Sequence, residues 1–271
     1  MEYLIIFPAL LMLVLGAIQF ALLYQIKSTL NYATFMAARQ GALKNAKSTS
    51  IQDALAAGMT PLFTFSPDLS GLARGRAIAA IEAFNPMTTN VAILSPTTNT
   101  ADDFGVPDPA DSNKRLVPND NLQYRDATVL GAKTGLNIQD ANLLKIRVTY
   151  CAKLIVPVVN VMIYSLVNGI TGTVVGTGEF FGDAAVSKTA TTPNMCSQLK
   201  DKYGEKVNSI VEAASNFAGI DASFLNSTLN DISSFVSGFT VPGLDWSIGG
   251  YRIPVTAEAV MRMQSPARFN K

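Results

Sequence analysis

Glu2 is the residue whose chemistry depends most on its position, because it precedes a long apolar segment. No further charged residue occurs before Lys27. A carboxylate is costly to place in hydrocarbon unless a positive group neutralises it. We therefore expect Glu2 to pair with a positive N-terminal amine, of its own or of an adjacent copy of the chain, within an apolar core. Such a buried pair would also set the axial register between copies.

The only two cysteines, Cys151 and Cys196, are the next residues with defined chemistry. In an oxidising compartment they would form one disulfide, worth about 3–4 kcal/mol in the chain-entropy treatment. The alternative is a pair of separate buried thiols, and cysteine counting alone leaves both possibilities open.

The absence of histidine excludes several classes of enzyme. Histidine is the commonest general base and the commonest metal ligand, so Ser-His-Asp, Cys-His and histidine-based metal mechanisms are excluded. The formal net charge is only +1, and lysine and arginine do not cluster as a phosphate-binding surface requires. We therefore predict a protein that is not an enzyme, has no cofactor or metal, and binds no nucleic acid.

An apolar helix must position Glu2, and the chain has enough hydrophobic residues to build it and a separate body. Of the 271 residues, 48% are hydrophobic. Because a helix rises about 1.5 Å per residue, the segment 4–24 is long enough to cross the roughly 30 Å hydrocarbon core of a bilayer. An amphipathic pattern continues from Gln25. We expect one rod from near Tyr3 to about Lys47.

Five residues of this rod have special backbone or packing properties. Pro8 and Gly16 predict a kink or local melting, which would help a subunit to leave the bilayer. Ala33, Ala37 and Gly41 stand four residues apart, and such a small-residue stripe allows helices to approach closely. The stripe packs either under the body of the same chain or against another copy, and the sequence leaves both open.

The rest of the chain predicts short helices and one long loop. The polar stretch 97–125, rich in Pro, Asp and Asn, predicts a surface loop. Its aspartates lack the order and the distal glutamate of a calcium loop, so we expect solvated acids there. Segment 158–167 is expected to be buried or to face a partner. The predicted helices are 51–58, with a break and cap at 48–50, and then 68–84, 158–167, 206–217 and 222–235.

Alternating residues predict strands at 90–95, 143–150 and 253–263. In the last two, one face is apolar and the other carries charges. We expect these two strands to pair, with Glu258 offering a cross-strand partner to Lys145 or Arg147.

The opening of the chain resembles a known family. Glu2-Tyr3, then Pro8, and then Leu15-Gly16-Ala17-Ile18-Gln19-Phe20 resemble the start of TadE-like pseudopilins, from the tight-adherence (Tad) branch of type IV pili. The ending Val260–Pro266 is similar to the tail of some of these proteins. The resemblance implies a pilin-like α+β fold, with a long N-terminal hydrophobic helix followed by a globular domain that holds a small antiparallel sheet and several short helices.

The resemblance also implies a domain organisation and a location. We expect residues 1–47 to be a membrane and filament-core helix, and residues 48–271 to be an exported globular domain. Cationic residues normally stay on the cytoplasmic side of a span, and here they only follow it. We therefore expect a basic leader ahead of Met1 to have been removed, with the protein first in the inner membrane and later in an extracellular filament.

The predicted function is that of a structural subunit that polymerises through its N-terminal helix into a pilus for adhesion. Its partners would be other copies of itself, the inner membrane and, by resemblance, the pilus assembly machinery and a prepilin peptidase. One alternative is a minor pseudopilin or membrane-anchored assembly factor. The body is longer than in typical Tad major pilins, so the resemblance fits a pseudopilin or an enlarged filament subunit better. The alternative from another class is a membrane-tethered surface enzyme or binding protein.

Overall fold

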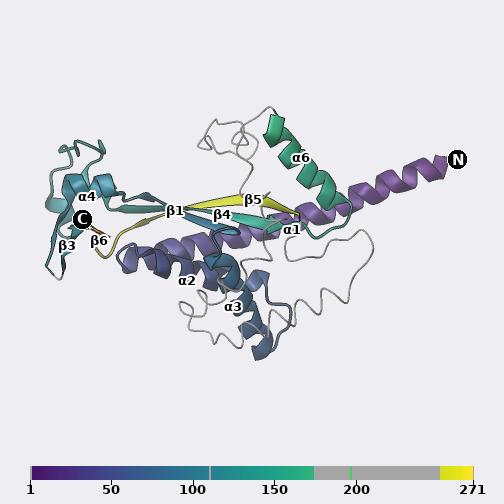
Figure 1. The fold of residues 1–271 in the computed structure, drawn as a ribbon, viewed down its shortest axis with the longest axis horizontal. Coiled ribbons are helices and arrows are strands. Elements are labelled where there is room, and N and C mark those ends of the chain that lie inside the picture. The colour runs from purple at the N-terminus through teal and green to yellow at the C-terminus, as the bar shows by residue number, and fades with distance from the viewer. Residues whose placement is uncertain (1, 110, 174–195, 197–250, 271) are drawn as a thin grey trace.

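The computed structural model describes residues 2–109, 111–173, 196 and 251–270 (Figure 1). The helices predicted at 206–217 and 222–235 lie outside the described residues. Within them, one long helix, several shorter helices and two three-stranded antiparallel sheets are present. The predicted α+β class, a long N-terminal apolar helix followed by a domain with small antiparallel sheets and short helices, is confirmed.

The predicted rod is one continuous helix of 42 residues, α1 (Glu2–Leu43). It ends shortly before the predicted position because Asn45 and Ala46 adopt left-handed backbone conformations, with φ of 57° and 56°, and turn the chain back. Of the kink or local melting predicted near Pro8 and Gly16, the melting is not present, since α1 continues through both residues, and the kink stays a prediction. Proline removes one backbone hydrogen bond from a helix, and here the neighbouring turns stay helical.

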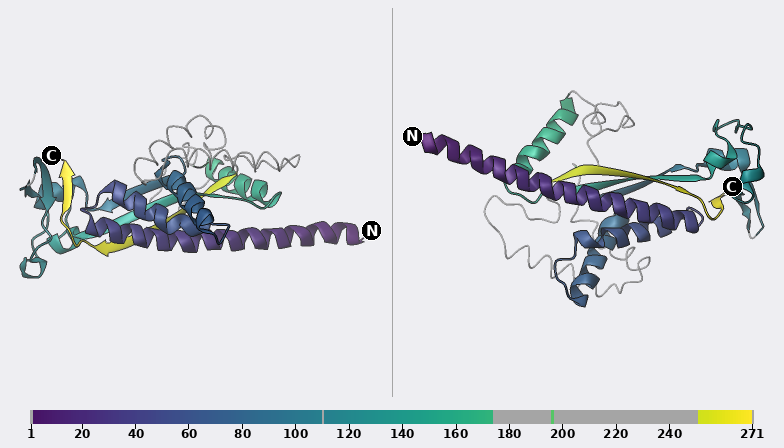
Figure 2. Two further views of the ribbon diagram at one scale, coloured as in Figure 1. Left: turned by 90° about the horizontal axis from the view of Figure 1, so that it is seen from below. Right: turned by 180° about the vertical axis from the view of Figure 1, so that it is seen from behind.

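Helices α2 (Ser48–Met59) and α3 (Leu69–Phe84) follow, joined by the short helix η1 (Thr60–Leu62). Helix α2 runs back along the C-terminal half of α1 (Figure 2). The predicted break and cap at 48–50 are placed too late, because α2 already begins at Ser48. Lys47 occupies the cap position and makes no side-chain cap hydrogen bond.

The hydrophobic core lies between the C-terminal half of α1, helix α2 and one face of a sheet. Small residues bring the two helices close together. A Cβ atom on Gly58 of α2 would lie 2.6 Å from the Cα atom of Ala33, closer than real atoms approach. The second half of α1 is therefore part of the core, through the buried residues Leu30, Ala33, Ala37, Ala38 and Ala42.

The larger sheet has the strand order β1-β4-β5, with β1 (Thr89–Ser95), β4 (Leu143–Lys153) and β5 (Arg252–Arg262). All three predicted strands are confirmed, and the predicted pairing of the last two is also present, with Arg147 opposite Glu258. Alternation in β4 buries one face against α1, as the apolar pattern predicts. The buried side chains are those of Leu144, Ile146, Val148, Tyr150 and Ala152.

The predicted loop at 97–125 is wrong, because this stretch builds the far end of the molecule (Figure 1). The side chains of Thr97 and Thr100 form a capping box at the start of a short helix. A second sheet, in the order β2-β3-β6, then pairs this stretch with the C-terminal strand. That long-range pairing leaves no local pattern in the sequence. The elements are α4 (Thr98–Phe104), β2 (Val106–Asp108), β3 (Asp111–Val117), η2 (Leu122–Tyr124), α5 (Ile138–Ala141) and β6 (Ala267–Asn270).

Helix α6 (Val159–Thr173) follows β4, so the helix predicted at 158–167 exists and extends further. It lies beside the middle of α1, nearer the N-terminus of α1 than the other short helices (Figures 1 and 2). Its Tyr164 ring contacts the ring of Tyr251 just before β5, with the ring centroids 4.9 Å apart.

Candidate functional site

The N-terminal half of α1 extends beyond the rest of the described structure (Figure 2). Its large apolar side chains are exposed. The helix holds an 18-residue window with a mean hydropathy of 2.4, of which only 6% is buried. By length and composition it can cross a membrane. Such a surface needs lipid or protein around it. Its exposed large side chains are those of Ile6, Phe7, Leu10, Leu11, Leu13, Val14, Ile18 and Phe20.

Three residues predicted to act in assembly lie in this protruding half. Glu2 is the first described residue of α1, Pro8 is exposed, and a Cβ atom on Gly16 would have no neighbour within 4 Å. The space next to the Gly16 Cα atom is therefore open, as a site of contact with another helix requires. The roles of these residues in assembly, including the pairing of Glu2 with an amine, stay predictions.

Gln19 is a site residue that the sequence reading did not single out. Its side chain is fully buried, and its Oε1 atom accepts hydrogen bonds from the backbone N–H groups of Ile155 (3.1 Å) and Val156 (2.8 Å). Gln19 thus fastens α1 to the segment that joins β4 to α6. The available signal was an amide within an apolar run, because a polar side chain in such a run needs a partner.

The small-residue stripe of α1 packs against the body of the same chain. Ala33 and Ala37 are fully buried. A Cβ atom on Gly41 would lie 2.8 Å from Ile51 Cγ1 and 2.8 Å from Leu144 Cδ2. The sequence left two arrangements open for this stripe. In the single chain it packs under the body of the same chain. A role of the stripe between copies stays a prediction.

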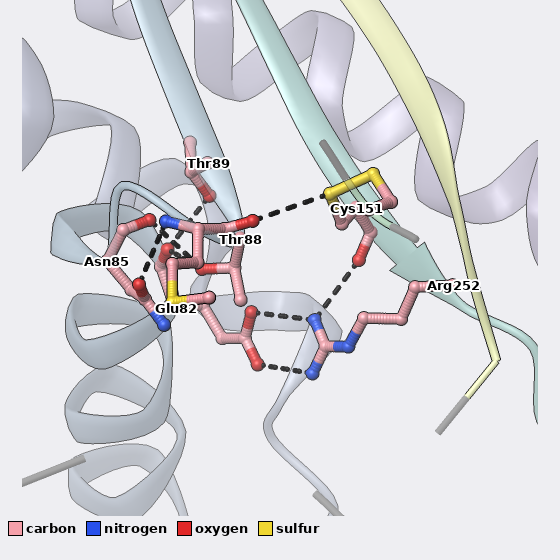
Figure 3. The surroundings of a disulfide bond; sticks show 8 residues. Glu82, Asn85, Thr88, Thr89, Cys151 and Arg252 are labelled. Atoms are coloured by element: carbon pink, nitrogen blue, oxygen red, sulfur yellow. Dashed lines mark hydrogen bonds and ion pairs between the residues drawn. A yellow bond between two sulfur atoms is a disulfide. The ribbon is translucent and has the colours of Figure 1, made fainter. Parts of the chain in front are cut away.

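Cys151 and Cys196 form a disulfide whose Cα atoms are 5.5 Å apart (Figure 3). Cys151 belongs to β4, and both cysteines are buried. The disulfide covalently ties the chain around Cys196 to the larger sheet.

A buried ion pair lies beside this disulfide (Figure 3). The Arg252 guanidinium donates from Nη1 to Glu82 Oε2 (3.0 Å) and from Nη2 to Glu82 Oε1 (2.9 Å), and Nη1 also donates to the Cys151 carbonyl (3.1 Å). The hydroxyls of Thr88 and Thr89 donate to the Glu82 carbonyl at 2.7 and 2.8 Å. The pair joins α3, β4 and β5 at one end of the sheet. Sequence reading missed it, because the partners stand 170 residues apart.

Charged side chains on the solvent-facing side of the larger sheet form the ion pairs that the sequence predicts. Glu258 accepts from Arg147 Nε (2.6 Å) and lies 3.1 Å from Lys145 Nζ. The hydrogen bond from Lys145, followed by that from Arg147, lowers the pKa of Glu258 below its ordinary value. Both predicted cross-strand partners are therefore used.

The aspartates of α4, at the far end of the molecule, form ion pairs with cationic side chains and accept hydrogen bonds from hydroxyl and N–H groups. Asp102 contacts Lys133 (2.6 Å) and Arg115 (3.2 Å), and the hydrogen bond from Lys133 lowers the pKa of Asp102. Asp103 accepts from the Thr134 hydroxyl and from backbone N–H groups. Within the described residues, no group of three or more acidic or sulfur ligands comes together as a metal site would require.

Comparison with protein families gives a match at the N-terminus of the chain. The family model of TadE-like protein matches residues 1–39, which confirms the resemblance predicted from the opening of the sequence. The match covers the protruding half of α1 and most of its packed half. No curated protein and no solved structure matches the chain.

Proposed function

We propose that this chain is a pilin-like structural subunit of a Tad-type pilus system. Helix α1 first anchors it in the inner membrane and later polymerises with copies of itself as the core of an extracellular filament. The observation that carries this proposal is the TadE-like match over residues 1–39 on a helix whose N-terminal half exposes large apolar side chains. The proposal builds on a TadE-like N-terminal segment whose helix is long and apolar enough to cross a membrane.

Burial of α1 supplies the driving force for both states. Each large apolar side chain contributes about 1.5–3 kcal/mol when it leaves water, so the exposed half of α1 strongly favours lipid or a helix bundle. Transfer from lipid to a filament core gains much less, because both environments are apolar. Extraction from the membrane therefore requires an energy-coupled assembly machine, and a prepilin peptidase is the implied processing enzyme.

Within this function, Glu2 neutralises an N-terminal amine of its own or an adjacent subunit. An isolated buried charge would carry a desolvation cost of several kcal/mol. Glu2→Ala should reduce the yield of sheared filaments while leaving the amount of folded, disulfide-bonded protein in the membrane unchanged. Glu2→Gln should be milder, because the amide keeps a hydrogen-bond acceptor. Wild-type filament yield in both variants would contradict the pairing.

A second candidate function is that of a minor pseudopilin or a membrane-anchored assembly factor. The large body built on α2, α3 and two sheets favours it. Quantification of this chain in purified filaments separates the two functions. A main component of the filament supports the structural subunit, whereas a trace amount together with loss of filaments on deletion supports the minor one. The third candidate, a membrane-tethered enzyme or binding protein, has no catalytic constellation in its favour within the described residues.

A further inference from the structure

Helix α6 and the segment before it present an exposed apolar surface close to α1. We call it the α6 surface, and it consists of side chains that are each roughly half exposed. Charge is absent from the sequence around it, since no charged residue occurs from Leu154 to Gly178. The exposed apolar residues fall within one short segment of the chain, and apolar patches on a protein exterior mark interaction sites. The residues of the α6 surface are Ile155, Val158, Val161, Met162 and Leu166.

The α6 surface is attached to α1 at a defined level. Gln19 accepts hydrogen bonds from the backbone of Ile155 and Val156, immediately before α6. The next residues of the α6 surface follow closely in the sequence, at Val158, Val161 and Met162. Figures 1 and 2 show that α6 starts beside α1, at the end of the sheet that lies nearest the protruding N-terminal half of α1. The vertical position of α1 in a membrane therefore decides the position of α6.

That level falls at the edge of the hydrocarbon. The uncharged run of α1 ends at Lys27, and the exposed Tyr24 precedes it, as is typical of residues at a membrane interface. Tyr24 stands five positions after Gln19, so Gln19 lies about 8 Å deeper along the helix axis. Interfacial helices bury their apolar faces about 5–10 Å into the boundary between headgroups and acyl chains.

We propose that the α6 surface lies in the membrane interface, in contact with lipid acyl chains, while α1 spans the bilayer. This inference rests on the proposed membrane anchoring of α1. Lipid is favoured as the occupant because α6 starts beside α1, next to its exposed apolar half, and the sequence around α6 lacks charges. A charged body at this level would require desolvation of its charges. The body thus has two membrane contacts, one spanning and one interfacial, and extraction of the subunit must remove both.

The test uses the full chain in phosphatidylethanolamine and phosphatidylglycerol vesicles. Because both native cysteines form the disulfide, one new thiol can carry an environment-sensitive fluorophore. Met162→Cys reports the α6 surface. Leu130→Cys is the matched control, since Leu130 is an apolar residue with 62% exposure against 55% for Met162, in the loop before α5. Leu10→Cys, at 59% exposure, reports whether α1 is inserted. Lipids with nitroxides in the upper or lower acyl chain serve as quenchers.

The proposal expects loss of most of the fluorescence at position 162 with upper-chain nitroxides, and little change at position 130. The result must persist when the protein is diluted in lipid. Quenching at position 10 but equal signals at 162 and 130 would overturn the α6 inference alone. If the fluorophore at position 162 is protected from the nitroxides at a high protein-to-lipid ratio and loses this protection on dilution, a second copy covers the α6 surface. That result would also overturn the α6 inference. No quenching at position 10 would refute membrane anchoring itself and, with it, this inference.

Discussion

The Arg252 guanidinium faces the Glu82 carboxylate in a buried bidentate pair, with N–O distances of 2.9 and 3.0 Å. The two side chains are only 4% and 8% exposed. Glu82 comes from α3 and Arg252 from the first residue of β5, so the pair connects the helical layer with the sheet. Removal of either partner takes this bidentate contact away from a charge that stays buried.

Glu82→Ala should destabilise the protein by about 3–5 kcal/mol, because the Arg252 charge would stay buried without its carboxylate. Urea unfolding of the full chain in mild detergent, followed by circular dichroism, measures this change. Asp53→Ala is the matched control. This substitution removes the ion pair between Asp53 and Arg76. Because the Asp53 side chain is 50% exposed, the free energy of unfolding should fall by only about 0–1 kcal/mol. Equal effects of the two substitutions would contradict a special role of the buried pair.

Gly58→Ala should also destabilise the body, since the new Cβ atom would lie 2.6 Å from the Ala33 Cα atom. Overpacking of this kind costs about 1–3 kcal/mol. Gly16→Ala provides the comparison, because a Cβ atom there meets nothing within 4 Å. The same urea experiment should show no loss of stability in Gly16→Ala. A neutral Gly58→Ala would mean that α1 and α2 can separate without cost.

Gln19→Leu should release the segment between β4 and α6 from α1. The substitution leaves the N–H groups of Ile155 and Val156 without their acceptor, and each unsatisfied buried group costs about 1–3 kcal/mol. Amide hydrogen exchange at these two residues should become faster. Gln25→Leu changes an exposed glutamine of the same helix and should leave the exchange unaltered. Unchanged protection in Gln19→Leu would show that other contacts hold the segment.

The Glu258 cluster predicts a small stability change at acidic pH. Because the folded-state pKa of Glu258 is lowered, its contribution is present above the unfolded-state pKa of about 4.3. It is lost as the pH falls through the lower folded-state value. Glu258→Gln should therefore differ from wild type at pH 7 by about 1 kcal/mol or less, given the solvent screening, and match it at the acid end. A difference that grows on acidification would contradict this assignment.

Truncation tests how much of α1 the body requires. A chain beginning at Ser48 lacks the buried α1 residues of the core, including Leu30 and Ala37, and should not fold. A chain beginning at Ile18 keeps these residues together with Gln19, and should give a folded protein with the native disulfide. Protease resistance and thiol counting without reduction measure both outcomes. A stable chain from Ser48 would show that the sheet and α2 suffice alone.

The sequence by itself determined the elements that have a strong local period. The apolar run of α1, the alternation of β4 and β5, and the pairing of Glu258 with Lys145 and Arg147 were all readable. A side chain's position on one face of a helix or strand follows from spacing alone. The TadE-like opening was readable for a similar reason, because its residues lie within one short segment.

Only the tertiary structure decided the contacts that join distant segments. The stretch 97–125 became α4, β2 and β3 because strand β6 from the other end of the chain pairs with β3. The Gln19 contact and the Glu82–Arg252 pair likewise depend on residues more than 100 positions apart. A local sequence window holds only one of the two partners in each case. It therefore cannot show which polar residue of a helix becomes buried, or which polar stretch becomes a sheet.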